Sequence, residues 1–182
     1  MTDRIKTSLP EFCYKRKPIQ PVGVVIHYIS ARNILPKDPF NLDAIISIFK
    51  KYHVSAHGLI RRDGTFIELV PKEFIAYHAG YSRMNGRDWC NNFTFGYELE
   101  GGSDWDFTDE QIIVLADELA KDMTEHQFTL EWIQGHDRVR YDWNEAHPEK
   151  QASKKYDPGE HFPWKILNDM LEGVSISITN NK

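Results

Sequence analysis

The sequence predicts a single α/β domain with a central mixed β-sheet flanked by helices. The run from Val22 to Ile29 is apolar on both faces, which is typical of a buried central strand. Asp63-Gly64 lies between two strand-like runs, which indicates a hairpin. Residues 109–126 are amphipathic at helical spacing and lie between strand-like segments. A hairpin among mixed strands and helices favours a mixed sheet over a regular repeat of strand, helix and strand.

In the first half of the chain, short strands and loops surround one predicted helix. Asn41 can cap this helix, because its side-chain oxygen can accept a hydrogen bond from the first helical turn. Polar residues and prolines before position 20 predict an irregular leader. The expected segments are, in order, the leader packed on the fold (1–20), a strand (22–29), a loop (30–41), the helix (42–52), two hairpin strands (54–60 and 65–70) and a long connection (71–92) with a short helix near 71–75.

In the second half, the longest predicted helix begins after Thr108. Thr108-Asp109-Glu110-Gln111 fits a capping box, and apolar residues recur on one side of the helix. Pro163 fits the first turn of a last helix, which Gly173 is expected to stop. The expected segments are a strand (93–101), the long helix (109–126), a short strand (130–134), a polar extended loop (138–153), the last helix (163–172) and a C-terminal tail (173–182). The domain itself is expected to span residues 21–172.

Length and composition fit one soluble domain. The chain has 182 residues, of which 41% are hydrophobic and 27% charged, so there is enough apolar material for a core. The net charge of −5 gives no overall attraction to nucleic acid or to an anionic membrane, and neither is expected as a partner. Cys13 and Cys90 cannot build a disulfide framework and are expected to be free thiols. Without a signal peptide or an apolar run of roughly 20 residues, the protein is expected in the cytoplasm.

Two histidines and one aspartate stand where a metal site could form. His27 and His136 each end an apolar run, and Asp157 precedes a Pro-Gly turn. Two imidazoles and a carboxylate are a common set of three protein ligands for a catalytic zinc, with the fourth position left for water. Their wide separation in sequence leaves open a buried, hydrogen-bonded histidine at each position. His161 is the main rival ligand.

Two further residue types could carry chemistry beside such an ion. Glu98 and Glu100 alternate along a strand and therefore share one face. Glu98 is the candidate general base, whereas Glu100 is expected to orient a loop, and a solvent-exposed face is the alternative for either. Lys155 lies two residues before Asp157, so in an extended segment it points the same way and could stabilise an oxyanion. Lys154 is expected to be a surface charge.

Seven short motifs then occur in a fixed order along the chain. They are Val25-Ile26-His27, the run from Val54 to Gly64, His78-Ala79-Gly80, Cys90-Asn91-Asn92-Phe93, the run from Gly96 to Gly101, Gly135-His136 and Lys155-Tyr156-Asp157-Pro158-Gly159. Together they resemble the zinc-dependent N-acetylmuramoyl-L-alanine amidases of the AmpD type, which are related to phage lysozyme amidases and peptidoglycan recognition proteins. Each motif is weak alone, but seven in order are specific, and they cover residues 20 to 170.

This resemblance implies a fold, a cofactor and a reaction. The fold is a central mixed sheet with helices packed against it, and zinc is held by His27, His136 and Asp157. Glu98 and Lys155 are implied to be catalytic. The reaction cleaves the amide between the lactyl group of N-acetylmuramic acid and the L-alanine of the stem peptide. The expected partner is peptidoglycan or a muropeptide, and the enzyme is expected to be a monomer.

The chain departs from the family pattern around the substrate. Members that recycle wall fragments in the cytosol carry Asn after the first ligand histidine, and Arg before both the Val-Ser-Ala-His stretch and Cys-Asn. This chain has Tyr28, His53 and Trp89 there, and aromatic groups suit stacking on the sugar rings of intact wall. Residues 138–153 also look longer than the usual link and are expected to add a wall to the groove. The expected substrate contacts are Tyr28, His57, His78, Ala79, Gly80 and Trp89, although a core histidine is the favoured interpretation of His57.

The expected role is therefore degradation of the cell wall, for example by a phage endolysin that a separate pore releases. A cytosolic amidase that recycles anhydromuropeptides is an alternative. A recognition module that binds muropeptide without cutting it is a second alternative, and a zinc hydrolase for an unrelated amide is a third.

Overall fold

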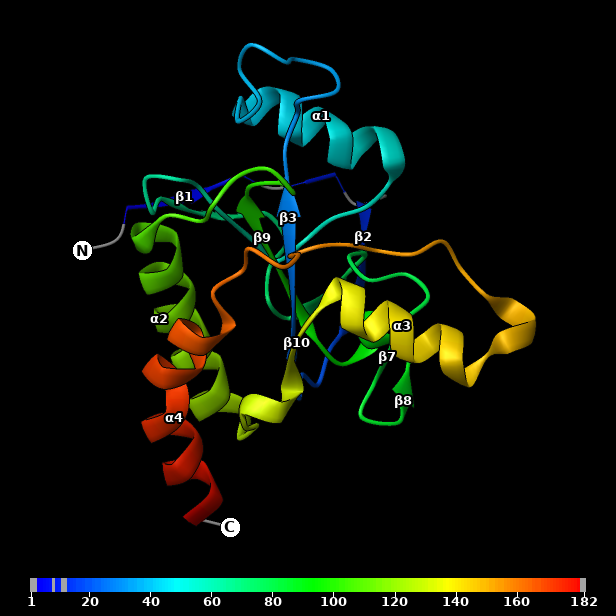
Figure 1. The fold of residues 1–182 in the computed structure, drawn as a ribbon, viewed down its shortest axis with the longest axis vertical. Coiled ribbons are helices and arrows are strands. Elements are labelled where there is room, and N and C mark those ends of the chain that lie inside the picture. Colours follow the sequence, from blue (N-terminus) through cyan, green and yellow to red (C-terminus); the bar gives the residue numbers. More distant parts are fainter. Residues whose placement is uncertain (1–2, 8, 11–12, 181–182) are drawn as a thin grey trace.

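A six-stranded mixed sheet forms the centre of the fold (Figure 1). The computed structural model describes residues 3–7, 9–10 and 13–180. The strand order is β1 (Arg4–Lys6), β5 (Phe66–Glu68), β4 (Gly58–Ile60), β9 (Phe95–Glu100), β3 (Val24–Ile29) and β10 (Ile133–Gly135). The pair β4–β5 is antiparallel and the other pairs are parallel, which confirms the prediction of a mixed sheet.

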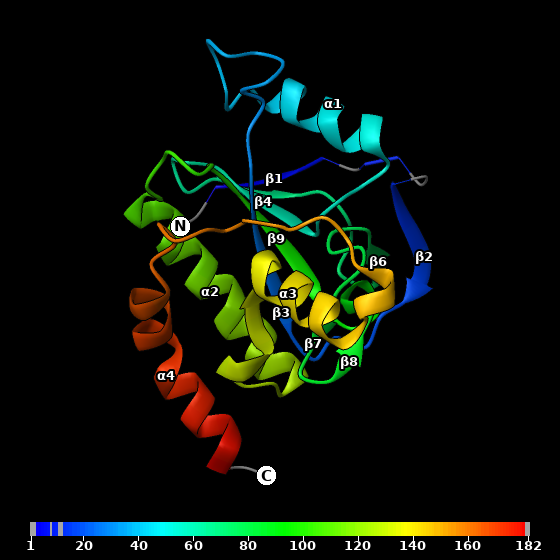
Figure 2. The ribbon, with the colours of Figure 1, turned by 45° about the vertical axis from the view of Figure 1, so that its right-hand side comes forward.

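The two faces of the sheet are covered by different helices. Helices α2 (Asp109–His126) and α4 (Trp164–Asn180) lie side by side over one face, where they share a core with Ile26 and Tyr97 (Figures 1 and 2). Helix α1 (Leu42–Tyr52) packs near Leu59 on the other face, and helix α3 (His136–Ala146) packs near Val25. Alternation along β3 places His27 on the same face as Val25, so this face carries the candidate site between α1 and α3.

Local signals position the predicted helices and hairpin as expected. The side chain of Asn41 accepts a hydrogen bond of 3.0 Å from the backbone of Ala44 at the start of α1. Thr108 and Gln111 form the predicted capping box of α2. Gly64 has a φ of 81° in the hairpin turn, a conformation that glycine adopts without steric cost. These elements confirm the corresponding predictions.

The leader is more regular than predicted. Strand β1 joins the edge of the central sheet, and β2 (Tyr14–Pro18) pairs with β6 (Phe74–Ala76). Arg4 also donates to the buried carboxylate of Glu118 on α2 over 2.5 Å. Edge strands are held by backbone hydrogen bonds to a neighbour distant in sequence, so their own polar composition does not reveal them. Residues 1–2, 8 and 11–12 of the predicted leader lie outside the described residues.

The connection before β9 contains strands in place of the predicted short helix. These are β6, β7 (Arg83–Met84) and β8 (Arg87–Asp88), followed by a 3-10 turn (Cys90–Asn92). The short β7–β8 pair lies beneath α3 (Figures 1 and 2). Cys13 and Cys90 are both buried and free, as predicted.

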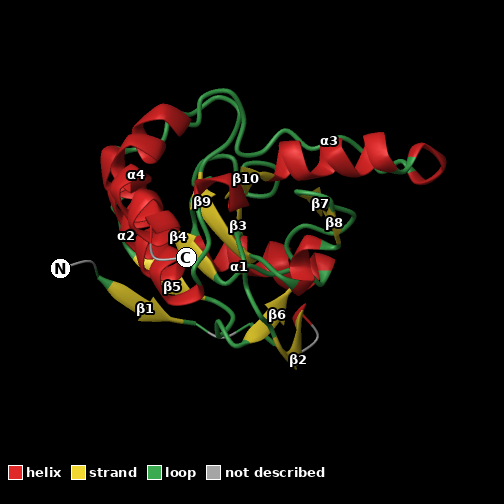
Figure 3. Cartoon of the chain, turned by 90° about the horizontal axis from the view of Figure 1, so that it is seen from below, coloured by secondary structure: helices red, strands yellow, loops and turns green. Residues whose placement is uncertain are grey.

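Residues 138–153, predicted to be an extended loop, instead contain most of helix α3 and a 3-10 turn (Pro148–Lys150). Val139 and Trp143 lie four residues apart and are both buried, which provides the helix with a narrow apolar stripe. Seen from below in Figure 3, α3 runs outward and the chain after it comes back beside it. Residues 151–158 form this returning segment. Two hydrogen bonds between Asn144 and Ala152 tie that returning segment to α3.

Helix α4 does not stop at Gly173, as was predicted, but continues to Asn180. A glycine inside a helix costs only about 0.5–1 kcal/mol relative to alanine. Leu171 and Ile178 lie on either side of Gly173 and are both buried in the core shared with α2, which outweighs that cost. The expected C-terminal tail is therefore helical up to residue 180. Within the described ranges, no helix has the length and apolarity needed to span a membrane.

Candidate metal centre and active site

Strand register brings His27, His136 and Glu98 together. Strand β10 pairs with β3 so that Gly135 stands opposite Ile26, which places His136, the first residue of α3, beside His27. Strand β9 pairs with β3 so that Glu98 stands directly opposite His27 and on the same face. Three segments far apart in sequence therefore meet at the middle of β3.

Asp157 reaches this point because the returning segment crosses Gly135. The backbone N–H of Asp137, in the first turn of α3, donates to the backbone oxygen of Asp157 over 2.8 Å. A Cβ atom on Gly135 would lie 2.6 Å from Cδ of Pro158, which is closer than real side chains approach. Only glycine at position 135 lets the segment pass closely enough for Asp157 to face the two histidines.

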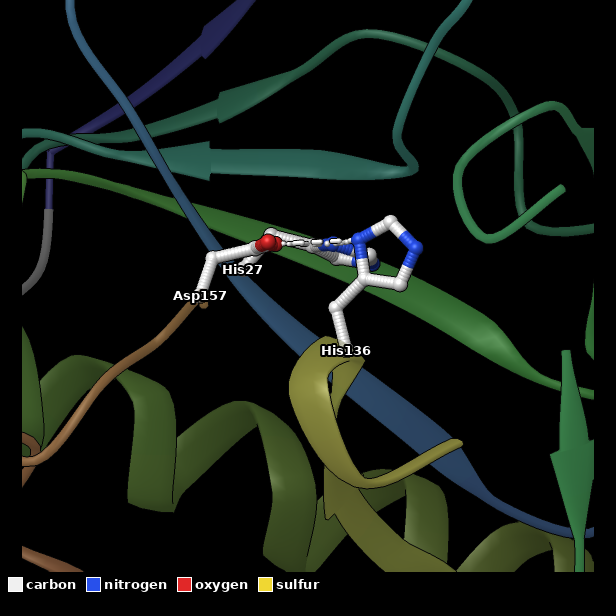
Figure 4. Close-up of side chains that lie close together, drawn as sticks. All are labelled: His27, His136 and Asp157. Atoms are coloured by element: carbon white, nitrogen blue, oxygen red, sulfur yellow. Dashed lines mark hydrogen bonds and ion pairs between the residues drawn. The ribbon is translucent and has the colours of Figure 1, made fainter. Parts of the chain in front are cut away.

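The three side chains point toward one another (Figure 4). Nδ1 of His27 lies 3.0 Å from Nδ1 of His136 and 2.9 Å from Oδ2 of Asp157, and Nδ1 of His136 lies 3.0 Å from Oδ2 of Asp157. Ligands bound tetrahedrally to zinc at 2.0–2.1 Å are separated by about 3.3 Å, so these atoms need to move by only a few tenths of an ångström. The two imidazoles are buried, whereas the Asp157 side chain is 15% exposed and is the most exposed of the three.

Hydrogen bonds on the far side of each ring fix the tautomers of both histidines. Nε2 of His136 faces the backbone oxygen of Ala79 at 3.1 Å, and a carbonyl only accepts, so this nitrogen carries the proton. Nε2 of His78 faces the backbone oxygen of Thr94 at 3.3 Å and is protonated for the same reason. Nδ1 of His78 must then accept from Nε2 of His27, 3.1 Å away. Both Nδ1 atoms in the centre therefore present lone pairs.

The charge states agree with this assignment. Burial lowers the pKa of His27 to about 4, so the ring is neutral at pH 7. Burial raises the pKa of Asp157, but its contacts with His136 and His27 outweigh burial and hold the pKa well below its ordinary value. The neutral His27 ring, one nitrogen of His136 and the ionised carboxylate of Asp157 therefore converge on one point. Such a group of acceptors fits a cation, and its nitrogen and oxygen donors suit zinc.

Glu98 lies beside His27 on the same face of the sheet. It is 9% exposed, and its Oε2 atom is buried without a hydrogen-bond partner among the described residues. Burial, followed by the charge of Asp157, raises the pKa of Glu98 well above its ordinary value, whereas Lys155 lowers it. A carboxyl group with an unpaired oxygen and a raised pKa is suited to accept and release a proton.

The charge of Lys155 acts on both His27 and Glu98 and lowers the pKa of each. Its side chain is exposed, and it lines a groove beside the centre. The structure therefore brings His27, His136, Asp157 and Glu98 together. Lys155 lies close enough for its charge to act on His27 and Glu98.

Glu100 and His161, the alternative candidates for a catalytic carboxylate and a metal ligand, contact other residues. Glu100 accepts from Nε of Arg61 at 2.9 Å and from the backbone of Arg62 at 3.0 Å, so it holds the hairpin turn, as expected. His161 lies 3.5 Å from Asp106 and is not a member of the histidine–aspartate cluster.

The expected substrate contacts are divided between core and surface. His57 is 1% exposed, its Nε2 donates to the oxygen of Phe74, and its Nδ1 accepts from Gly96, so it is a core histidine and is left out of the proposed substrate site. His78 lies behind His27, and Ala79 is buried. The exposed members are Gly80, the partly exposed Tyr28 and Trp89, which is 46% exposed.

Arg140 is a site residue that sequence reasoning missed. Its guanidinium donates to the backbone oxygens of Tyr81, Ser153 and Ala79, and thereby ties α3 to the segments on either side of the centre. Arg140 lies in the segment that was predicted to be a loop. The only sequence feature that indicated a helix there was the four-residue spacing of Val139 and Trp143.

A groove of about 1110 Å³ runs beside the centre between α3 and the returning segment. Its lining includes Tyr28, Asp137 and Pro158, each the sequence neighbour of a candidate metal ligand, together with Lys155. The ligands themselves do not line it, so the groove flanks the centre on its outer side. Residues of the 138–153 segment line this groove, and most of them belong to helix α3.

Comparisons with known proteins point to one family. Residues 16–160 match the family model described as N-acetylmuramoyl-L-alanine amidase. The 1,6-anhydro-N-acetylmuramyl-L-alanine amidase AmpD of Haemophilus influenzae is 31% identical over 180 residues, which cover 91% of this chain and 90% of that protein. The solution structure of Citrobacter freundii AmpD matches with a TM-score of 0.64 and 30% identity, over 92% of this chain and 90% of that one.

A third similar structure contains a bound substrate. It is the complex of the N-acetylmuramyl-L-alanine amidase AmiD from E. coli with anhydro-N-acetylmuramic acid-L-Ala-D-gamma-Glu-L-Lys. The TM-score is 0.63 and the identity 25%, over 86% of this chain and 59% of that one, so this chain spans about three fifths of the length of that protein.

Proposed function

Because the chain belongs to the N-acetylmuramoyl-L-alanine amidase family, we propose that it uses zinc to hydrolyse the amide between N-acetylmuramic acid and the L-alanine of a peptidoglycan stem peptide. The metal ligands in this proposal are His27, His136 and Asp157. Glu98 and Lys155 are the catalytic residues.

The convergence of three acceptor atoms within 3.0 Å carries the metal assignment. Two imidazole nitrogens and a carboxylate oxygen at this distance attract a cation placed between them. When bound, zinc would lower the pKa of a water molecule toward about 7 and polarise the scissile carbonyl.

Glu98 and Lys155 act on opposite charges in the reaction. Glu98 accepts a proton from the attacking water and passes it to the nitrogen of the departing L-alanine. Its buried, unpaired Oε2 supports this role, because a proton gained there is not held by a competing partner. Lys155 places its ammonium near the oxygen on which negative charge develops, and its exposed position lets it meet a substrate from solution.

We propose intact cell wall as the substrate, as an endolysin would require. The support is the set of departures at Tyr28, His53 and Trp89, where this chain offers rings to a sugar. A recycling amidase is the second candidate, because the H. influenzae relative is named for a 1,6-anhydro substrate. A recognition module without catalysis is disfavoured, because none of the five metal and catalytic residues is missing.

Metal analysis and turnover of variants test the chemistry. His27→Ala and Asp157→Ala should lose both zinc and turnover, whereas His161→Ala, a histidine outside the cluster, should keep both. Glu98→Gln should retain zinc and lose turnover by about 10²-fold or more. Lys155→Ala should lose turnover while Lys154→Ala, its exposed neighbour, does not. A Glu98→Gln variant that hydrolyses muropeptide at the normal rate would exclude Glu98 as the base.

Digestion of two substrates tests the role. Intact sacculi should release material with new L-alanine amino termini. Cleavage of free anhydromuropeptide without any cleavage of sacculi would support recycling instead.

A further inference from the structure

We propose that Tyr81 and Trp89 form an aromatic platform that stacks against a pyranose ring of the peptidoglycan glycan strand. This inference rests on the proposed function and identifies the part of the substrate that the enzyme recognises away from the scissile bond. It therefore assigns the intact strand, and not only the muropeptide, as the ligand.

The two rings of the platform are supported from below and open above. Their centroids lie 5.2 Å apart, and the side chains are 48% and 46% exposed. The ring of Trp143 from α3 packs 5.2 Å from Tyr81 and 4.9 Å from Trp89, and it is 2% exposed. His147 packs 4.1 Å from Trp143 on the same helix. Rings held in this way lose little conformational freedom when a ligand binds.

The backbone of Trp89 is held in a conformation that a tryptophan rarely adopts. Its φ is 66° and its ψ 63°, in the left-handed region that favours glycine. Its N–H donates to the oxygen of Ser82 over 2.8 Å, and its own oxygen accepts from Asn92 over 2.9 Å. A strained residue persists only where its surroundings hold it, and such residues gather at ligand sites. This backbone conformation places the indole ring of Trp89 beside the ring of Tyr81.

Hydrogen bonds connect the segment that carries Tyr81 to the candidate metal centre. The oxygen of Ala79 accepts from His136, and two residues span at most about 7 Å, so the backbone of Tyr81 lies within that distance of Ala79. Arg140 donates to the oxygens of both residues, at 2.6 Å for Tyr81 and 3.5 Å for Ala79. A strand whose muramic acid is at the metal centre therefore has a neighbouring sugar within reach of the platform.

The size and rim of the platform favour a sugar over a protein. Two half-exposed rings offer roughly 200 Å² of apolar surface, whereas a stable protein interface buries about 800 Å² on each partner. Residues 71–92, all of which are described, contribute no other exposed large apolar side chain. At the rim, Asp88 pairs with Arg83 and accepts from Nε2 of His147 over 2.9 Å. A pyranose has the matching chemistry, with an apolar face and hydroxyl groups around its edge.

A glycan without peptide tests the platform independently of catalysis. Chitotetraose, a β-1,4-linked chain of N-acetylglucosamine, is titrated into the zinc-loaded Glu98→Gln enzyme while tryptophan fluorescence is followed. A saturable change is expected. Adding Trp89→Gly or Tyr81→Ala should weaken the apparent affinity at least tenfold. Trp89→Gly suits the test because glycine adopts a φ of 66° without strain, and Trp89→Phe, which keeps a ring, should retain binding.

Turnover supplies the second readout. In an otherwise native enzyme, Trp89→Gly should lower kcat/KM on intact sacculi at least tenfold, and by a larger factor than on N-acetylmuramyl-L-alanyl-D-isoglutamine. Ile176→Ala removes an equally exposed apolar side chain from α4, on the opposite face, and should change neither rate. No chitotetraose binding, or equal losses on both substrates, overturns the platform. An enzyme that binds chitotetraose but cleaves neither substrate overturns the proposed function alone.

Discussion

Gly96 leaves the space in which His78 contacts His27 of the candidate metal centre, so Gly96→Ala should weaken the proposed zinc binding without altering a ligand. A Cβ atom at this position would lie 2.7 Å from Nδ1 and 2.8 Å from Cβ of His78. Favourable contact requires about 3.5 Å or more, so the His78 ring must retreat by roughly 1 Å. That shift breaks its 3.1 Å hydrogen bond with Nε2 of His27.

The expected magnitude follows from two separate effects. Overpacking of a buried position should lower the free energy of unfolding of the metal-free protein by about 1–3 kcal/mol. Loss of an outer hydrogen bond to a ligating histidine should weaken zinc binding by about 10- to 100-fold. Zinc affinity is measured by competition with a chelating dye at fixed pH, and stability by urea unfolding of the metal-free protein.

Two further variants separate packing from support of His27. His78→Phe keeps a ring of similar size but removes the acceptor nitrogen, so it should weaken zinc binding with a smaller loss of stability. Gly173→Ala on α4 is the matched control, because an added Cβ meets nothing within 4 Å. It should stabilise the protein by about 0.5–1 kcal/mol and leave zinc affinity unchanged. Unchanged zinc affinity in both Gly96→Ala and His78→Phe would refute the support that we assign to His78.

Three other predictions concern the crossing point, a helix cap and acid stability. Gly135→Ala should reduce zinc affinity at least tenfold in the same competition assay, because its Cβ would displace Pro158 and the ligand beside it. Thr108→Ala removes the cap that accepts from Gln111, and should lower the free energy of unfolding by about 1 kcal/mol in urea. Burial lowers the pKa of His57 from 6.5 to about 4, so its contribution is fully present above pH 6.5 and is lost as the pH falls toward 4. Urea unfolding of the metal-free His57→Gln variant should show a shallower decline over that range, and an identical decline would contradict this assignment.

Structural features that depend on only a few neighbouring residues could be predicted from the sequence. The caps at Asn41 and Thr108 and the Asp63-Gly64 turn act through hydrogen bonds and backbone angles of adjacent residues, so local sequence predicts them. Features that depend on contacts between residues distant in sequence could not be predicted. Helix α3 was predicted as a loop because its buried stripe is only Val139 and Trp143, and Gly173 was read as a helix stop although buried neighbours carry the helix past it.

The same division applies within the candidate site. Residue type and motif order were sufficient to single out His27, His136, Asp157, Glu98 and Lys155. They could not show that His57 is sealed in the core, or that His78 supports His27 in place of lining a groove. Burial and the partner of each ring nitrogen depend on neighbours from other segments.

By itself, the sequence determined the donor chemistry, the secondary-structure boundaries set by caps and turns, and the resemblance to an amidase family. Only the tertiary structure decided which histidine nitrogens face one another, how the returning segment crosses Gly135, and that Tyr81 joins Trp89 on a shared support. The physical reason is that a side chain's identity belongs to one residue, whereas a lone pair's direction and a ring's exposure are set by packing between segments that are distant in sequence.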